Sequence, residues 1–278
     1  GGSSPAVPHP PANPRVFCPD RRTATYALER SGSRGGRAVS EAPVAVVTEA
    51  GTVPDALAGT DVCVVDPAAD TDVLATARVV VAVGEPSLLS AARRRHDTPI
   101  APVSTGSDRY DVPGAALDAV VDAAADGDLR TTAHPALDVA VDGDDVGTAI
   151  ADVTLLTAAP ARISEFGVAV DDGWRASVRA DGVVVATPLG STGYARDAGG
   201  PELAPDTGLV AVPISAYARH AHPWVLRPPL SLSVERDEAD VTLRLDDAAV
   251  RSVPPNTPVE VTTGEPVSFV SPRQFPPE

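Results

Sequence analysis

The chain has 278 residues, enough for two domains, and a formal net charge of −16, with 22 basic residues that are all Arg. This composition offers no basic surface to neutralise nucleic-acid phosphates, and no apolar run approaches the about 20 residues that a membrane span needs. We therefore expect no nucleic-acid partner and no membrane partner, and we interpret the acidic, Lys-free surface as a halophilic adaptation, because molar salt screens charge repulsion within about 3 Å.

Residues 1–15 are rich in Gly, Pro and Ser, which predicts a disordered tail. From Pro43 onward, short Val-rich runs alternate with helical stretches, a pattern typical of a parallel, Rossmann-like sheet that is buried on both faces. We place this α/β N-terminal domain at residues 16–134. Its expected strands are Val44–Val47, Val62–Val65, Val79–Val83 and Ile100–Val103, and its expected helices are Val53–Leu57, Leu88–Arg95 and Gly114–Ala125.

After about His134 the pattern changes to strands joined by Asp-Gly turns, which predicts a β-sandwich-like domain over residues 135–258. The fold class is therefore α/β plus all-β, and residues 259–278 form a C-terminal segment that we expect to return to the N-terminal domain. The expected strands of the second half are Ala136–Val141, Val153–Leu156, Glu165–Val170, Ala176–Arg179, Val183–Thr187, Leu230–Val234, Val241–Leu245 and Val259–Thr262.

Two cysteines, Cys18 and Cys63, have neither metal-ligand spacing nor a secretory context. We expect them to be reduced thiols in a cytoplasmic protein.

The most informative segment is Asp181–Pro201, which reads DGVVVATPLGSTGYARDAGGP. An acid-Gly turn leads into an apolar strand, and a loop with glycines, hydroxyls and one tyrosine follows. Glycine lets the backbone approach a ligand closely, hydroxyls bond sugar or phosphate oxygens, and an aromatic ring covers a flat base. The segment resembles the signature of the ATP-NAD kinase family, and the order of elements resembles that family over about residues 60–272.

This resemblance implies an NAD-kinase-like architecture with a nucleotide between the two domains. The N-terminal domain lies on the phosphate-donor side, and the β-rich domain binds NAD or NADP. ATP or polyphosphate with Mg²⁺ is the implied phosphate donor, and a homo-oligomer is the implied assembly.

The resemblance also assigns residues of the signature. Asp181 contacts the nicotinamide end, in some relatives from a neighbouring subunit, and Asp197 replaces a serine with a negative charge next to a substrate phosphate. Leu189 replaces a Thr or Ser and removes a hydroxyl. The residues implied to line the nucleotide are Thr192, Gly193 and Tyr194.

The family's phosphate-binding loop, GGDGT, corresponds to Gly84–Glu85–Pro86–Ser87 after the third expected strand. By resemblance, Glu85 takes the place of the catalytic Asp that accepts the proton of the 2′-hydroxyl. Gly84 approaches the phosphates, and Ser87 supplies the hydroxyl of the threonine. Pro86 removes an amide donor and fixes φ near −65°. The alternative is that the segment only turns the chain from strand to helix.

Ala151–Asp152 stands where the family has an Asn-acid pair that holds the adenosine part of NAD. Asp152 retains a carboxylate able to accept from ribose hydroxyls, although an exposed acid at a strand edge is an equal alternative. Leu245–Asp246–Asp247 resembles a later family turn. No P-loop motif and no His/Cys cluster occurs, so we expect no protein-bound metal.

Three hypotheses follow from this pattern. The first is an NAD kinase that phosphorylates the 2′-hydroxyl of NAD to give NADP. The second is a catalytically impaired paralogue, a pseudoenzyme that acts as a dinucleotide-binding or regulatory protein. The third is a relic whose loop only shapes the β domain. The substitutions fall on the phosphate loop, whereas Asp181, Thr192 and Tyr194 are retained, which favours binding over turnover.

Overall fold

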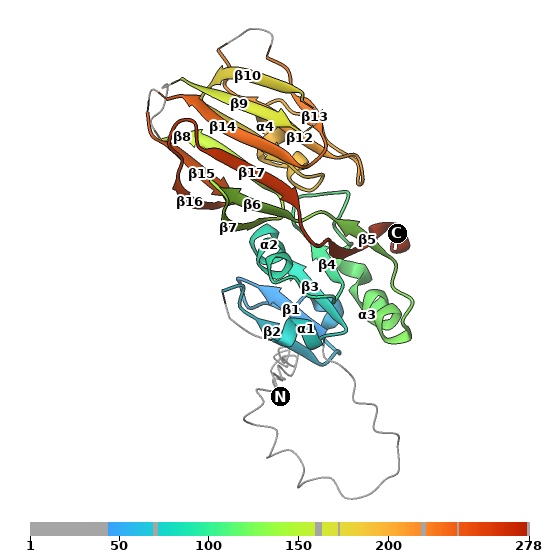
Figure 1. Cartoon of the computed structure of the whole chain (residues 1–278). Coiled ribbons are helices and arrows are strands. Elements are labelled where there is room, and N and C mark those ends of the chain that lie inside the picture. Colours follow the sequence, from blue (N-terminus) through green and yellow to red (C-terminus); the bar gives the residue numbers. More distant parts are fainter. Residues whose placement is uncertain are drawn as a thin grey trace, which may run out of the picture.

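The computed structural model describes residues 44–68, 72–158, 163–171, 173–217, 221–237 and 239–276. The predicted tail and Cys18 lie outside these residues. Figure 1 shows an α/β half, coloured blue to green, and a β-sandwich half, coloured green to red. The expected fold class of α/β plus all-β is therefore confirmed.

The α/β half is built on a six-stranded sheet with the order β2-β1-β3-β4-β18-β5. The neighbouring strands β2, β1, β3 and β4 pair in parallel, as their Val-rich sequences predicted. The fifth strand of the sheet is β18, from the C-terminal end of the chain. It pairs with β4 in parallel and with β5 in the antiparallel sense. The strands are β1 (Val44–Thr48), β2 (Val62–Val65), β3 (Val79–Val83), β4 (Ile100–Val103), β5 (Thr131–His134) and β18 (Val267–Val270).

Helices cover both faces of this sheet. One face packs on α1 (Val73–Thr76) and α2 (Glu85–Arg93), and the other packs on α3 (Leu117–Asp126). The predicted helix at Leu88–Arg95 starts three residues earlier, because Pro86 already has the φ of a first helical turn. Short 3₁₀ turns lie at Asp55–Leu57 (η1), Gly114–Ala116 (η2) and Pro272–Gln274 (η4).

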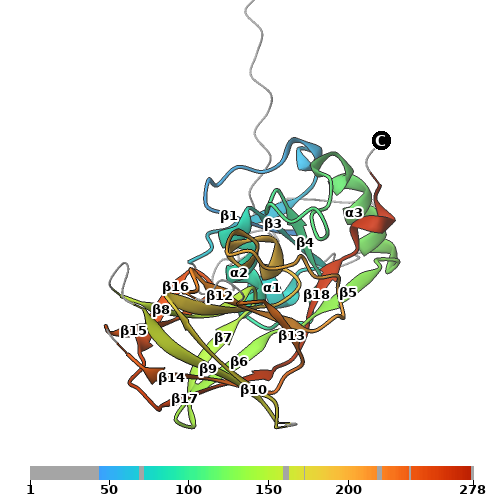
Figure 2. The same ribbon diagram turned by 90° about the horizontal axis from the view of Figure 1, so that it is seen from above.

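The second half is a sandwich of two six-stranded antiparallel sheets, with the orders β10-β9-β14-β17-β6-β7 and β13-β12-β11-β8-β15-β16. Aliphatic side chains from both sheets form one core between them. Figure 2 shows the two layers from above, with α2 over one end of the sandwich. The first sheet contains β6 (Leu137–Val141), β7 (Asp144–Ala149), β9 (Ser164–Val170), β10 (Arg175–Ala180), β14 (Leu230–Arg236) and β17 (Pro258–Thr263). The second contains β8 (Asp152–Thr157), β11 (Gly182–Ala186), β12 (Leu209–Ile214), β13 (Trp224–Leu226), β15 (Val241–Leu245) and β16 (Ala248–Ser252).

Cys63, on β2, is disulfide-bonded. The expectation of a reduced thiol at this position is therefore wrong. That expectation rested on spacing and composition, which do not reveal which sulfurs a fold brings within bonding distance.

None of the helices in the described ranges is long and apolar enough to cross a membrane.

Candidate functional site

A cavity of about 300 Å³ lies where the two halves of the molecule meet. The α/β half contributes the start of α2, and the sandwich contributes the turn before β8, the loop after β11 and the turn after β15. The lining residues are Glu85, Pro86, Leu89, Ala151, Asp152, Gly190, Gly193, Tyr194, Asp197, Asp246 and Asp247. A second cavity of about 260 Å³ shares Asp152, Tyr194 and Asp246 with the first and adds Thr154, Leu156 and Arg244.

Glu85 reaches the cavity because Gly84 turns the chain sharply between β3 and α2. Gly84 has a φ of +83°, which glycine adopts without strain, and its amide donates to the carbonyl of Val103 at 2.9 Å. Glu85 is the first residue of α2. Burial, followed by the negative charges of Asp246 and Asp247, raises the pKa of the Glu85 carboxyl.

Two residues of the predicted phosphate loop do not line the cavity. Gly84 lies behind Glu85, and Ser87 is fully buried, with no hydrogen-bond partner for its hydroxyl among the described residues.

Asp152 lies opposite α2, at the first position of β8, and is 8% exposed. Its Oδ1 accepts a hydrogen bond from the hydroxyl of Thr154 at 2.9 Å. Burial is the main cause that raises the pKa of Asp152 to about 7, and the charges of Asp246 and Glu85 raise it further. The carboxyl therefore changes its protonation state close to neutral pH.

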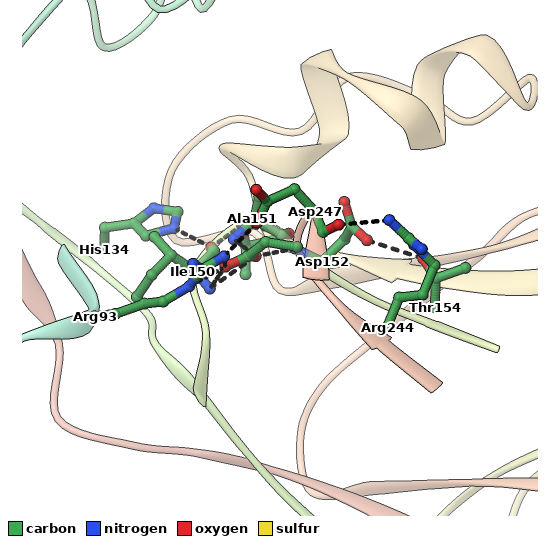
Figure 3. Close-up of polar contacts among 10 residues, drawn as sticks. Arg93, His134, Ile150, Ala151, Asp152, Thr154, Arg244 and Asp247 are labelled. Carbon is green, nitrogen blue, oxygen red and sulfur yellow. Dashed lines mark hydrogen bonds and ion pairs between the residues drawn. The ribbon is translucent and has the colours of Figure 1, made fainter. Parts of the chain in front are cut away.

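Asp246 connects the two halves of the cavity, a role that no local sequence pattern predicted. Its fully buried carboxylate accepts from three consecutive backbone amides, those of Ile150 at 3.0 Å, Ala151 at 2.6 Å and Asp152 at 3.0 Å. The same carboxylate receives both Nε and Nη2 of Arg93, at 2.9 and 2.7 Å, from the last turn of α2. Asp246 thus holds both the turn before β8 and the last turn of α2, and Figure 3 labels its partners Arg93, Ile150, Ala151 and Asp152.

A buried histidine also contacts the turn before β8. His134 Nε2 is 3.0 Å from the carbonyl oxygen of Ile150, and Nδ1 is 3.2 Å from the hydroxyl of Tyr110. A carbonyl only accepts, so Nε2 carries the proton and Nδ1 accepts from Tyr110. Complete burial lowers the pKa of His134 to about 4, which keeps the ring neutral. His134 is thus a structural residue that the sequence analysis did not single out.

The loop after β11 carries the signature residues and packs tightly on the same turn. It forms a 3₁₀ turn, η3 (Gly190–Thr192), and a short helix, α4 (Tyr194–Asp197). A Cβ on Gly190 would lie 2.1 Å from the carbonyl oxygen of Ala151, so only glycine fits there. Gly193, Tyr194 and Asp197 line the cavity, and Tyr194 is 44% exposed at its mouth.

Three other signature residues lie elsewhere. Thr192 donates its hydroxyl to the carbonyl of Leu189 at 2.8 Å and does not line either cavity. Asp181 also lines neither cavity and sits at the opposite end of β11, where its carbonyl accepts from Thr157. Leu189, interpreted from sequence as a lost hydroxyl, is a 6%-exposed core residue packed between the two halves.

A larger hollow of about 690 Å³ lies at the far end of the sandwich, where Trp174 and Trp224 meet edge to face. It contains none of the predicted site residues. The acid-lined cavity between the halves is therefore the candidate site.

The α/β sheet and the β-sandwich thus meet at this cavity. Residues 150–270 match the family model of the ATP-NAD kinase C-terminal domain. The C-terminal half of the chain is therefore similar to the C-terminal domain of ATP-NAD kinases.

Curated relatives support this homology over part of their length. The chain is 38% identical over 110 residues to the NAD kinase of Methanosarcina barkeri, which covers 39% of this chain and 37% of the relative. It is 35% identical over 157 residues to the NAD kinase of Oleidesulfovibrio alaskensis, which covers 53% and 54%. The match therefore spans about half, or less, of the length of these relatives.

Solved structures agree with the fold. The NAD kinase of Archaeoglobus fulgidus, in complex with ATP, superposes with a TM-score of 0.67 at 22% identity, covering 84% of this chain and 95% of that one. The yeast NADH kinase, in complex with NADH, superposes with a TM-score of 0.64 at 16% identity, covering 76% and 66%. At these identities the likeness concerns the fold.

Proposed function

We propose that the chain binds NAD or NADP in the cavity between its two halves. One observation carries this proposal: Glu85 from the α/β half and Asp152 and Tyr194 from the sandwich line the same space. The exposed ring of Tyr194 offers a flat surface to a nucleotide base, and Asp152 offers oxygens to ribose hydroxyls.

The protonation state of the Asp152 carboxyl makes the binding of the dinucleotide depend on pH. An ionised carboxylate accepts hydrogen bonds at both oxygens, whereas the protonated form loses part of this capacity. With a pKa of about 7, the acceptor form increases as pH rises through neutrality. The affinity for NAD therefore rises between pH 6 and pH 8.

The reaction that suits these residues is phosphoryl transfer to the 2′-hydroxyl of NAD. The 2′-oxygen bonds to the terminal phosphorus of ATP or polyphosphate, the bridging P–O bond breaks, and the shortened donor leaves. Glu85 accepts the hydroxyl proton, and its raised pKa makes it a better base than an ordinary carboxylate. Mg²⁺ enters with the donor phosphates, as part of the substrate.

The phosphate loop favours a second candidate, dinucleotide binding without turnover. The amide of Gly84 already donates its hydrogen bond to the carbonyl of Val103, and Pro86 has no amide hydrogen. Phosphates at this loop therefore lack two donors that a glycine-rich loop supplies. Binding of the dinucleotide depends on the sandwich side and does not need them.

Calorimetry with NAD and NADP, together with a coupled assay of NADP formation in molar KCl with Mg²⁺ and either ATP or polyphosphate, separates these outcomes. Asp152→Asn should weaken binding at pH 8 about tenfold, while Asp126→Asn, at an exposed position on α3, should not. NADP formation that is lost in Glu85→Gln supports the kinase. Binding without NADP formation supports the second candidate, and binding of neither dinucleotide refutes the proposal.

The oligomeric state remains a prediction. Asp181 lies outside the two cavity linings, although its charge helps to raise the pKa of Tyr194, and the proposed assembly would bring it to the dinucleotide of a neighbouring subunit. Sedimentation of the whole chain tests this, because a monomer would leave Asp181 without a contact to the dinucleotide.

A further inference from the structure

Among the residues that the structure describes, Arg244 is the single cationic side chain that lines the two adjoining cavities. All other charged groups in the two linings are carboxylates. They belong to Glu85, Asp152, Asp197, Asp246 and Asp247. A dinucleotide adds the negative charge of its phosphates to this space, so a ligand of this class needs a cation in the cavity.

Strand register places Arg244 next to the ribose acceptor. Arg244 on β15 is directly opposite Thr154 on β8, and Asp152 precedes Thr154 by two residues on the same face of the sheet. Diagonal neighbours of this kind lie about 7–8 Å apart. The two side chains therefore lie on one face of the sheet, close enough for the charge of Arg244 to oppose the rise in the pKa of Asp152. Figure 3 shows Arg244 beside Thr154 and Asp152.

A backbone contact holds the guanidinium in position. Arg244 Nη2 donates to the carbonyl oxygen of Asp247, in the turn between β15 and β16. A guanidinium has five N–H donors in a planar fork, so this single contact leaves a pair of donors for an oxyanion. The Asp247 carboxylate makes its ion pair with Arg93 at 2.9 Å, and the nearby charge of Arg244 also helps to lower the pKa of Asp247.

We propose that Arg244 binds a phosphate group of the dinucleotide whose ribose contacts Asp152. This inference rests on the proposed function and deepens it, because it makes Arg244 the residue that selects phosphorylated ligands. The phosphate is either the pyrophosphate, which NAD and NADP share, or the 2′-phosphate, which NADP alone carries. Both present the same oxyanion to the guanidinium.

Calorimetry on the whole chain with adenosine, NAD and NADP tests this assignment. Arg244→Gln should weaken NADP binding about tenfold or more and leave adenosine binding unchanged, because adenosine has no phosphate. An equal loss for NAD and NADP identifies the pyrophosphate, and a loss for NADP alone identifies the 2′-phosphate. Arg244→Lys should fall between wild type and Arg244→Gln, because it keeps the charge without the fork.

Arg251→Gln is the matched control, since Arg251 is an exposed residue of the neighbouring strand β16 and removes the same charge outside both cavities. Equal effects of Arg251→Gln and Arg244→Gln overturn the inference, as does an equal loss of adenosine and NADP binding. Urea midpoints within error of wild type show that the variants fold. If wild-type protein binds none of the three ligands, the proposed function fails and the role of Arg244 fails with it.

Discussion

Replacing Asp246 by Ala should be the most destabilising single change at the site. The side chain is fully buried and serves three backbone amides and the Arg93 guanidinium. Its removal leaves these donors without an acceptor in a space that water does not readily reach.

The magnitude follows from these contacts. Removing one partner of a buried, hydrogen-bonded ion pair costs about 3–5 kcal/mol, and Asp246 also has a φ of +52°, which Asp tolerates better than Ala. For a chain of this size that corresponds to a fall in Tm of about 10 °C. Asp246→Asn keeps one acceptor oxygen for the amides and should lose about half as much. Asp247→Ala should cost less than about 1 kcal/mol, because that side chain is 69% exposed and pairs only with Arg93 among the described residues.

Urea unfolding followed by tryptophan fluorescence measures these differences, since Trp174 and Trp224 both report on the sandwich. A double-mutant cycle with Arg93→Ala then separates the ion pair from the amide contacts. Equal stabilities of Asp246→Ala and Asp247→Ala would refute the reasoning, because burial and the three amides would then contribute nothing.

Three further changes test the surroundings of the same turn. Gly190→Ala should destabilise the fold by more than about 2 kcal/mol in urea unfolding, because the new Cβ meets a backbone carbonyl at 2.1 Å, whereas Gly59→Ala, with nothing within 4 Å, should be nearly neutral; equal effects would contradict the close packing. Asp152 keeps a proton in the folded state between pH 4 and pH 7 that the unfolded chain releases, so stability falls as pH rises through this window, by up to about 1.4 kcal/mol per unit. Asp152→Asn should remove this slope, and parallel pH curves for the two proteins would show that the pKa is not raised. His134→Leu should cost about 2 kcal/mol by leaving the buried Tyr110 hydroxyl unpaired, whereas the Ile150 carbonyl still accepts from the Thr187 hydroxyl; part of this cost should return in the double variant with Tyr110→Phe, thermal melts of the single and double variants measure it, and no recovery would exclude the contact.

Local sequence was sufficient for the strands that are buried and rich in Val, such as β1, β3 and β11. It missed two apolar, largely buried strands, β12 and β18, as well as strands without an apolar pattern. β16 is exposed at all five positions, and β7 carries two exposed aspartates at its start, so neither resembles a strand until its neighbour is known.

The candidate site likewise contains some residues that local sequence indicates and others that it does not. Gly193 and Tyr194 belong to one continuous segment that local sequence singles out, and both line the cavity. The contact between Arg93 and Asp246 joins residues 153 positions apart, and no local pattern indicates it. From sequence, Leu189 was interpreted as the loss of a hydroxyl that the family carries. In the structure its burial between the two halves gives it a packing role.

The position of β18 has a consequence for the order in which the molecule is made. This strand lies between β4 and β5, yet it follows the entire sandwich along the chain. While the polypeptide emerges from the ribosome, β4 and β5 have no neighbour on their facing edges until residue 270 is available. The half that is synthesised first is therefore completed last, and its unpaired edges depend on the finished sandwich to deliver the missing strand.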